Sequence, residues 1–117
     1  MNWFVARIVY QIIAGGNTET SEFDERVILI SAEDNKNAFL KASTLGKQDE
    51  NSFLNYSGQK VEWKFIGVAE LNKTELMDGA ELHSRITDTD HAENYIHFVK
   101  QKDAAIKSGL ISLLEIV

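Results

Sequence analysis

The spacing of apolar and polar residues predicts two strands in the first third of the chain. Residues 3–13 alternate between an apolar set and a mixed set that contains Arg7, and this period of two is typical of a strand with one face on the core. The apolar set consists of Phe4, Ala6, Ile8, Tyr10 and Ile12. Residues 23–32 contain the unbroken apolar run 27–30, which is typical of a strand covered on both faces. We expect the two strands to pair in an antiparallel manner.

Helical spacing follows the second strand. An apolar stripe recurs every three or four positions, and its members are Ala38, Phe39, Ala42 and Leu45. Ser31 or Asp34 suits the N-cap of this helix, because a short polar side chain there can accept a backbone N–H. Gly46 suits the left-handed residue that ends a helix. The pattern therefore predicts a helix that stops at Gly46.

Residues 60–71 are the most strand-like part of the chain. Val61, Trp63 and Phe65 share one face, and after Phe65 the apolar positions change face around Gly67. A glycine at such a switch indicates a β-bulge or a close backbone approach. We expect this segment to be the central strand, with Trp63 and Phe65 anchoring the core.

The remaining segments give a fourth strand and a second helix. Residues 47–59 read as a polar connection pinned by Phe53 and Tyr56, and residues 80–87 alternate as a strand does. Residues 91–108 have helical spacing. The apolar tail, residues 110–117, fits a helix and a strand equally well, and it needs cover in the core or from a second copy.

These elements predict an α+β fold for the whole chain, residues 1–117, as one domain. The order is β-β-α-β-β-α, which gives a four-stranded, largely antiparallel sheet with the helices packed on one face. A length of 117 residues, with 44% hydrophobic and 26% charged residues, suits a single globular core.

Composition and charge limit the cellular compartment and the kinds of molecule that the protein is expected to bind. The chain has no cysteine, which excludes disulfides and thiolate metal sites and favours a reducing compartment. Its first residues lack the unbroken apolar run of a signal peptide, so we expect a cytoplasmic protein. A net charge of −6 without a basic cluster disfavours nucleic acid and anionic membranes as partners.

Several fragments together resemble a known family. They are Trp3–Ala6, Phe23–Glu25, Ala38–Lys47, Val61–Val68 and Asp78–Leu82. The pattern is similar to the short bacterial proteins grouped as domain of unknown function 4288, over about residues 3–87, and leaves the predicted C-terminal helix and tail, residues 88–117, outside. The resemblance implies a stand-alone bacterial cytoplasmic domain, and it assigns no catalytic or binding residue.

A polar sheet face offers the best candidate site. His83 and Arg85 alternate on one side of the predicted fourth strand. If Arg7 and Trp63 line the same sheet face, these four residues form a groove for a small anion or for acid–base chemistry. The alternative is a solvated face with a cross-strand ion pair. Because no nucleophile stands beside a base and no glycine-rich phosphate loop is present, we assign no catalytic residue and expect no cofactor.

The three histidines do not predict a metal site. His91 and His97 are six residues apart, so on a helix they point to different faces. Glu93 and His97 share a face at a spacing of four, which an ordinary exposed helix contact explains equally well.

The leading hypothesis is therefore a non-enzymatic binding or protein-interaction domain that self-associates. The absence of a catalytic motif and the apolar C-terminus favour it. One alternative is the small-molecule or acid–base site described above. Another is an immunity-type protein, whose acidic surface neutralises a basic partner.

Overall fold

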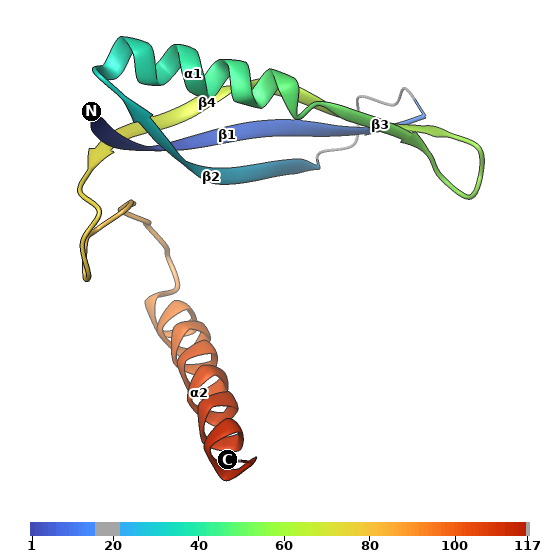
Figure 1. The fold of residues 1–117 in the computed structure, drawn as a ribbon. Helices are drawn as coiled ribbons and strands as arrows, with labels where there is room; N and C mark the ends of the chain where they lie inside the picture. Colours follow the sequence, from blue (N-terminus) through green and yellow to red (C-terminus); the bar gives the residue numbers. More distant parts are fainter. Residues whose placement is uncertain (16–21, 117) are drawn as a thin grey trace. The chain divides into compact units, whose positions relative to one another are not determined.

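The computed structural model describes residues 1–15 and 22–116, except for the side chains of residues 111–116. The chain divides into two compact units, Met1–Ser84 and Arg85–Val117. Among the described residues, the first unit contains four strands and one helix, and the second contains one helix (Figure 1). The two units are described separately below.

The sheet of the first unit is antiparallel throughout. β1 (Asn2–Ala14) pairs with β2 (Phe23–Ala32) on one side and with β4 (Lys60–Thr74) on the other. β3 (Asn51–Leu54) pairs with the start of β4, so the strand order is β2-β1-β4-β3. β4 lies inside the sheet as predicted, and β1 shares that interior position.

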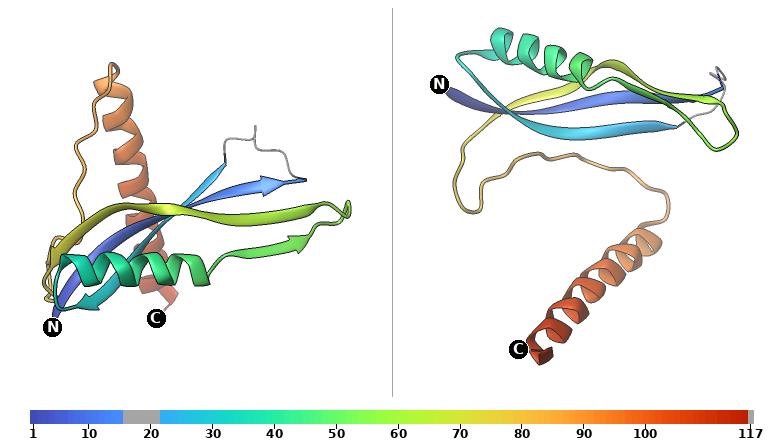
Figure 2. Two further views of the ribbon diagram at one scale, coloured as in Figure 1. Left: turned by 90° about the horizontal axis from the view of Figure 1, so that it is seen from above. Right: turned by 45° about the vertical axis from the view of Figure 1, so that its right-hand side comes forward.

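The helices complete the predicted fold class. α1 (Asn35–Gln48) connects β2 to β3 and contacts β1, β2 and β4, covering one face of the sheet (Figure 2). α2 (Ala92–Ile116) belongs to the second unit. The order of elements is β-β-α-β-β-α, which confirms the predicted α+β class.

The predicted fourth strand is wrong. The structure has no strand over residues 80–87, and the apolar side of this segment buries little, since Ile86 is 94% exposed. The missing strand is β3, inside the segment interpreted as a polar connection. β3 is exposed throughout and is positioned by a turn in which Asn55 Oδ1 accepts the backbone N–H groups of Ser57 and Gln59. Phe53 pairs with β4, whereas Tyr56 is fully exposed, so it does not hold this segment against the domain as predicted.

The core lies between α1 and the sheet. Most of the predicted apolar face of β1 is buried, but Ile12 is only half-buried while Ile13 is buried. The central cluster consists of Phe4, Ala6, Ile30, Ala32, Ala38 and Ala42. Phe39, predicted to join the helix stripe, is about half exposed. Small helix residues at the contact allow α1 to lie close to the strands.

Gly46 does not end α1. Asp34 is the N-cap as predicted and accepts the backbone N–H of Asn37 at 2.8 Å, but the helix continues to Gln48. A Cβ atom at Gly46 would lie 2.3 Å from Cε1 of Phe65, far inside van der Waals contact. The glycine is therefore required by close packing against β4 and not by a left-handed backbone.

β4 contains two bulges. Its register with β1 shifts between the pairs Tyr10–Phe65 and Val9–Gly67, and again between Ile8–Val68 and Arg7–Glu70. Ile66 and Ala69 are the extra residues, so the predicted irregularity at Gly67 is confirmed and a second one follows it. Phe65, just before the first bulge, meets the Tyr10 ring edge-on with a centroid distance of 5.7 Å.

The structure of the second unit decides between helix and strand for most of the C-terminal tail. α2 passes through Gly109 and ends at Ile116, so the described part of the tail, residues 110–116, is helical and the alternative strand is wrong there. The helix is longer than the predicted span of residues 91–108. A glycine in a helix interior reduces stability without preventing the helix.

Candidate functional site

Arg7, Glu70 and His83 form a charged cluster on the sheet face opposite α1. Arg7 and Glu70 are cross-strand partners on β1 and β4, with Arg7 Nε 3.5 Å from Glu70 Oε1. His83 comes from the segment after β4. Its Nε2 contacts Glu70 Oε2 and lies 3.4 Å from Arg7 Nη2. Because the carboxylate is an acceptor, we infer that the Nε2 that contacts it carries the proton. The structure thus brings together two of the four predicted site residues, Arg7 and His83.

The charged groups of the cluster interact with one another inside the protein. The side chains of Arg7 and His83 are 16% and 19% exposed. The hydrogen bond from His83, followed by the charges of His83 and Arg7, holds the pKa of Glu70 below its ordinary value, although partial burial opposes this shift. Thr74 Oγ1 also donates to the carbonyl of Glu81 at 3.2 Å. These contacts fasten the segment after β4 to the sheet.

Trp63 lies on the other face of the sheet. It pairs with Ile12, which alternates with Arg7 along β1, and its ring stacks on Phe53 with a centroid distance of 5.7 Å. Its Nε1 donates to Asp24 Oδ2, and the same oxygen accepts two bonds from Arg26. The groove expected from Arg7, Trp63, His83 and Arg85 therefore does not form as one face, and Arg85 falls in the second unit.

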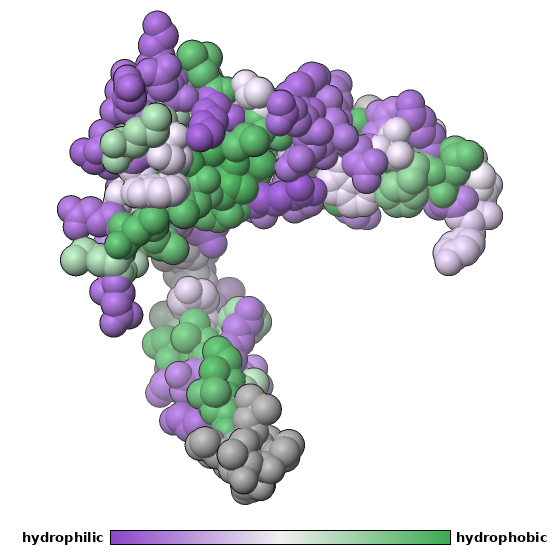
Figure 3. All heavy atoms as spheres, viewed as in Figure 1, coloured by the Kyte–Doolittle hydropathy of each residue, from purple (hydrophilic) through white to green (hydrophobic). Residues whose placement is uncertain are grey.

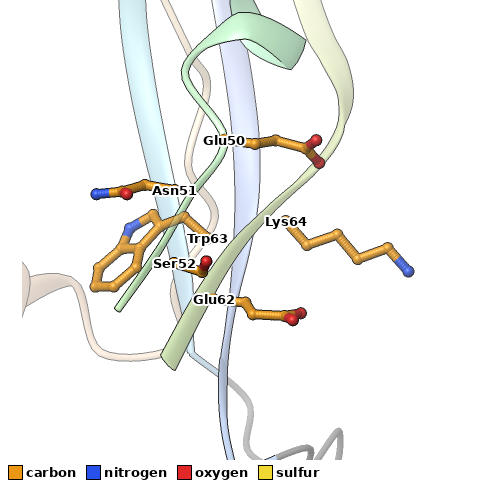
Figure 4. Close-up of a pocket in the computed structure, with 6 residues that line it drawn as sticks. All are labelled: Glu50, Asn51, Ser52, Glu62, Trp63 and Lys64. Atoms are coloured by element: carbon orange, nitrogen blue, oxygen red, sulfur yellow. The ribbon is translucent and has the colours of Figure 1, made fainter. Parts of the chain in front are cut away.

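A polar hollow of about 540 Å³ lies at the edge of β3 and β4. In Figure 4, Trp63 and Asn51 point to one side of the two strands, and Glu62 and Lys64 point to the other. The volume is in the range of ligand pockets, but the two carboxylates that line it, Glu50 and Glu62, are engaged locally. Lys60 pairs with Glu62 at 2.8 Å. Glu50 accepts the backbone N–H of Phe65, which together with Lys47 lowers the pKa of that carboxyl.

The described residues present no catalytic or metal-binding constellation. Over residues 1–15 and 22–116, no three His, Cys, Asp or Glu side chains gather as a metal site. The base in the cluster, His83, contacts a carboxylate and a guanidinium through the same ring nitrogen. The geometry stabilises local structure, and it offers no nucleophile to activate.

Comparison with protein families gives a match that covers most of the chain. A family described as Domain of unknown function (DUF4288) matches residues 3–84. The chain belongs to the DUF4288 family. Searches of curated proteins and of solved structures found no match. The matched region ends where the first unit ends, so this unit is the DUF4288 domain and α2 follows it. Within the described residues, neither helix has the length and apolar character needed to cross a membrane.

The open face of the DUF4288 unit is a feature that the sequence interpretation missed. β2 was expected to be covered on both faces, yet Val27 and Leu29 are 50% and 47% exposed, and Phe23 is also exposed. These side chains alternate with Ile28 and Ile30, which face the α1 side. The unbroken apolar run in the sequence indicated a partner on each face, and within Met1–Ser84 no described helix or strand covers the second face.

α2, outside the DUF4288 unit, is the second such feature. No side chain between Ala92 and Leu110 is buried. The large apolar residues among them are Tyr95, Ile96, Phe98, Val99, Ile106 and Leu110. Figure 3 shows apolar side chains gathered on the surface of this helix.

Proposed function

We propose that this protein is a non-enzymatic protein-interaction domain that self-associates through α2. The observation that supports the proposal is the long helix with exposed, large apolar residues along one side. Helices in proteins gain most of their stability from packing an apolar face, so a helix that no residue of its own unit covers calls for a partner surface.

The spacing of the apolar residues favours a second copy of the helix as that partner. Ala92, Val99 and Ile106 are each seven residues apart, which is the repeat that keeps one seam facing a neighbouring helix. Ile96 and Leu110 flank this seam. The apolar stripe is interrupted once, where Lys102 and Asp103 follow each other in the sequence.

The charged interruption is compatible with helix pairing because both groups have neighbours on their own helix. Lys102 Nζ lies 4.5 Å from the centroid of the Phe98 ring, a cation–π contact. Asp103 lies 4.0 Å from Lys107, one helical turn further on. Each charged group therefore has a contact on its own helix, and the apolar positions on both sides of them remain free to pack.

The mass of the protein in solution tests this proposal. Val99→Asp places a charge on the seam, whereas Ala104→Asp adds the same charge on the opposite side of α2. We expect multi-angle light scattering to give a dimer or larger assembly for the natural chain and for Ala104→Asp, and a monomer for Val99→Asp. A natural chain that stays monomeric at its highest soluble concentration would contradict the proposal, as would a Val99→Asp variant that keeps the assembled mass.

A further inference from the structure

We propose that the outer edge of β2 binds an extended segment of another protein as an additional β-strand. The proposed segment carries two alternating apolar side chains and one basic side chain. This interaction goes beyond self-association through α2, and it uses a different element of the molecule.

β2 is an edge strand, and its backbone groups alternate in direction. The carbonyl of Glu22, immediately before β2, accepts the N–H of Ile12 on β1, so even-numbered positions point toward β1. The carbonyl of Ser31 instead accepts a bond from Lys41 Nζ at 3.1 Å, so odd-numbered positions point outward. In an antiparallel ladder the N–H and C=O of one residue point to the same side. Glu25, Val27 and Leu29 therefore direct both groups to the open edge.

No hydrogen bond among the described residues of Met1–Ser84 engages the outward groups of Glu25, Val27 and Leu29. The edge is covered at its end only, where Lys41 caps the carbonyl of Ser31. Natural sheets protect long edges with charges, prolines or covering segments, because an unprotected edge pairs with another strand. β2 has no charged residue between Val27 and Ala32. Its edge therefore recognises the backbone of an extended chain, as in strand addition.

The side chains next to this edge define the chemistry of the partner. The same three odd positions place Val27 and Leu29, each about half exposed, on the open face of the sheet, with exposed Glu25 beside them. An added strand would lay two alternating side chains against Val27 and Leu29 and a third against Glu25. Apolar residues at the first two positions and a lysine or arginine at the third complement this surface.

A second copy of β2 does not meet this requirement. The odd positions of β2 carry Phe23, Glu25, Val27, Leu29 and Ser31, with no basic residue among them. Antiparallel self-pairing about Glu25 would place two glutamates opposite each other, pairing about Val27 would place Glu25 on Leu29, and pairing about Ile28 would place Glu25 on Ser31. None of these registers gives Glu25 a positive charge. We therefore assign the edge to a different protein whose segment supplies the positive charge.

Backbone-methylated peptides test the proposal directly. The probe is the blocked heptapeptide acetyl-Thr-Val-Thr-Val-Thr-Lys-Thr-amide, titrated into the full-length protein by calorimetry and by amide NMR shifts. N-methylation at its Val and Lys residues removes the donors that face β2 in antiparallel pairing, whereas N-methylation at the inner Thr residues removes donors on the far edge. The first change should weaken binding at least about tenfold, because three hydrogen bonds of about 1 kcal/mol are lost, and the second should leave it unchanged.

Protein variants provide the matched control. Val27→Lys keeps the backbone donor but repels the basic strand and removes the apolar contact, so peptide binding should fall at least about tenfold. Phe39→Lys, at an equally exposed apolar residue on α1, should bind the peptide as the natural chain does. We expect NMR shifts in the unmodified complex to centre on Glu25–Leu29.

Three outcomes would overturn the proposal. They are equal loss of binding for both methylated peptides, shifts that centre elsewhere, and a fall in the assembled mass of the Val27→Lys variant, which would show that a second copy occupies the edge. Because Val99→Asp tests α2 independently, failure of the strand proposal leaves self-association through α2 standing, and failure of self-association leaves the strand proposal testable.

Discussion

The two faces of the sheet are held by different kinds of interaction. On the face under α1, the contacts are apolar and close, and the helix approaches the strands through Ala38, Ala42 and Gly46. On the opposite face, an ion cluster holds the segment after β4, and Val27 and Leu29 remain half exposed. The same alternating strands therefore supply a complete core on one side and an incomplete surface on the other.

This difference separates structural from interacting parts of the domain. Close packing tolerates little change in volume, so substitutions on the covered face should reduce stability. A charged cluster depends on protonation and leaves its neighbours accessible, so substitutions on the open face should change pH dependence or binding. The predictions below test this separation, beginning with the largest expected effect.

Substitution of Gly46 should cause the largest loss of stability. Gly46→Val places new atoms where Phe65 already lies, since three ring atoms would be within 2.8 Å of the added Cβ. We expect a loss of roughly 3 kcal/mol in the free energy of unfolding, measured by urea denaturation. Gly109→Val is the matched control, because nothing lies within 4 Å of a Cβ there, and it should change stability by less than about 0.5 kcal/mol. Equal effects at the two glycines would contradict the packing argument.

Removal of the Tyr10 hydroxyl should have an intermediate effect. This group donates to the carbonyl of Gly46 at 2.7 Å, in the last turn of α1, where carbonyls lack partners within the helix. Tyr10→Phe should lower the free energy of unfolding by about 1 kcal/mol in the same urea experiment. Tyr56→Phe, at a fully exposed tyrosine, should leave it unchanged. A Tyr10→Phe variant as stable as the natural chain would show that water replaces the bond.

The smallest effect should appear at Glu70 and should depend on pH. The folded-state pKa of Glu70 is lowered, first by the hydrogen bond from His83, so its stabilisation is present above the unfolded pKa and is lost as the pH falls through the folded pKa. Glu70→Gln should therefore unfold at a lower urea concentration than the natural chain at neutral pH, and this difference should shrink on acidification. Glu75→Gln, at an exposed residue of the following segment, is the control. A difference that does not vary with pH would argue against the ion cluster.

Sequence patterns correctly predicted the features that depend on local geometry, such as a strand with one buried face. The alternation in β1 gave the correct core face for Phe4 through Tyr10, and Asp34 was one of two residues whose side-chain chemistry suited the N-cap, with Ser31 as the other. The face change at Gly67 correctly indicated an irregular strand. In each case the signal lies within a few residues and follows from local geometry.

Features that depend on distant partners were not predictable in this way. β3 has no alternation of burial, and only its pairing with β4 makes it a strand. The alternation in residues 80–87 has no strand to pair with. The proposed grouping of Arg7 with Trp63 required knowledge of the register, and the register separates them by an odd number of positions along β1, on opposite faces. Glu70, the partner that joins Arg7 to His83, carried no distinguishing pattern of its own.

The two bulges of β4 have a consequence for how the strand tolerates insertions and deletions. Each extra residue changes whether odd- or even-numbered residues of β4 face α1, and the second change cancels the first. Phe65 and Leu71 thus share the α1 side, and Val68 reaches that side between the bulges. Because Ile66 and Ala69 stand outside the pairing with β1, deleting either one should remove a bulge and leave the pairs on both sides in register. β4 should therefore lose either residue without turning a core side chain away from α1.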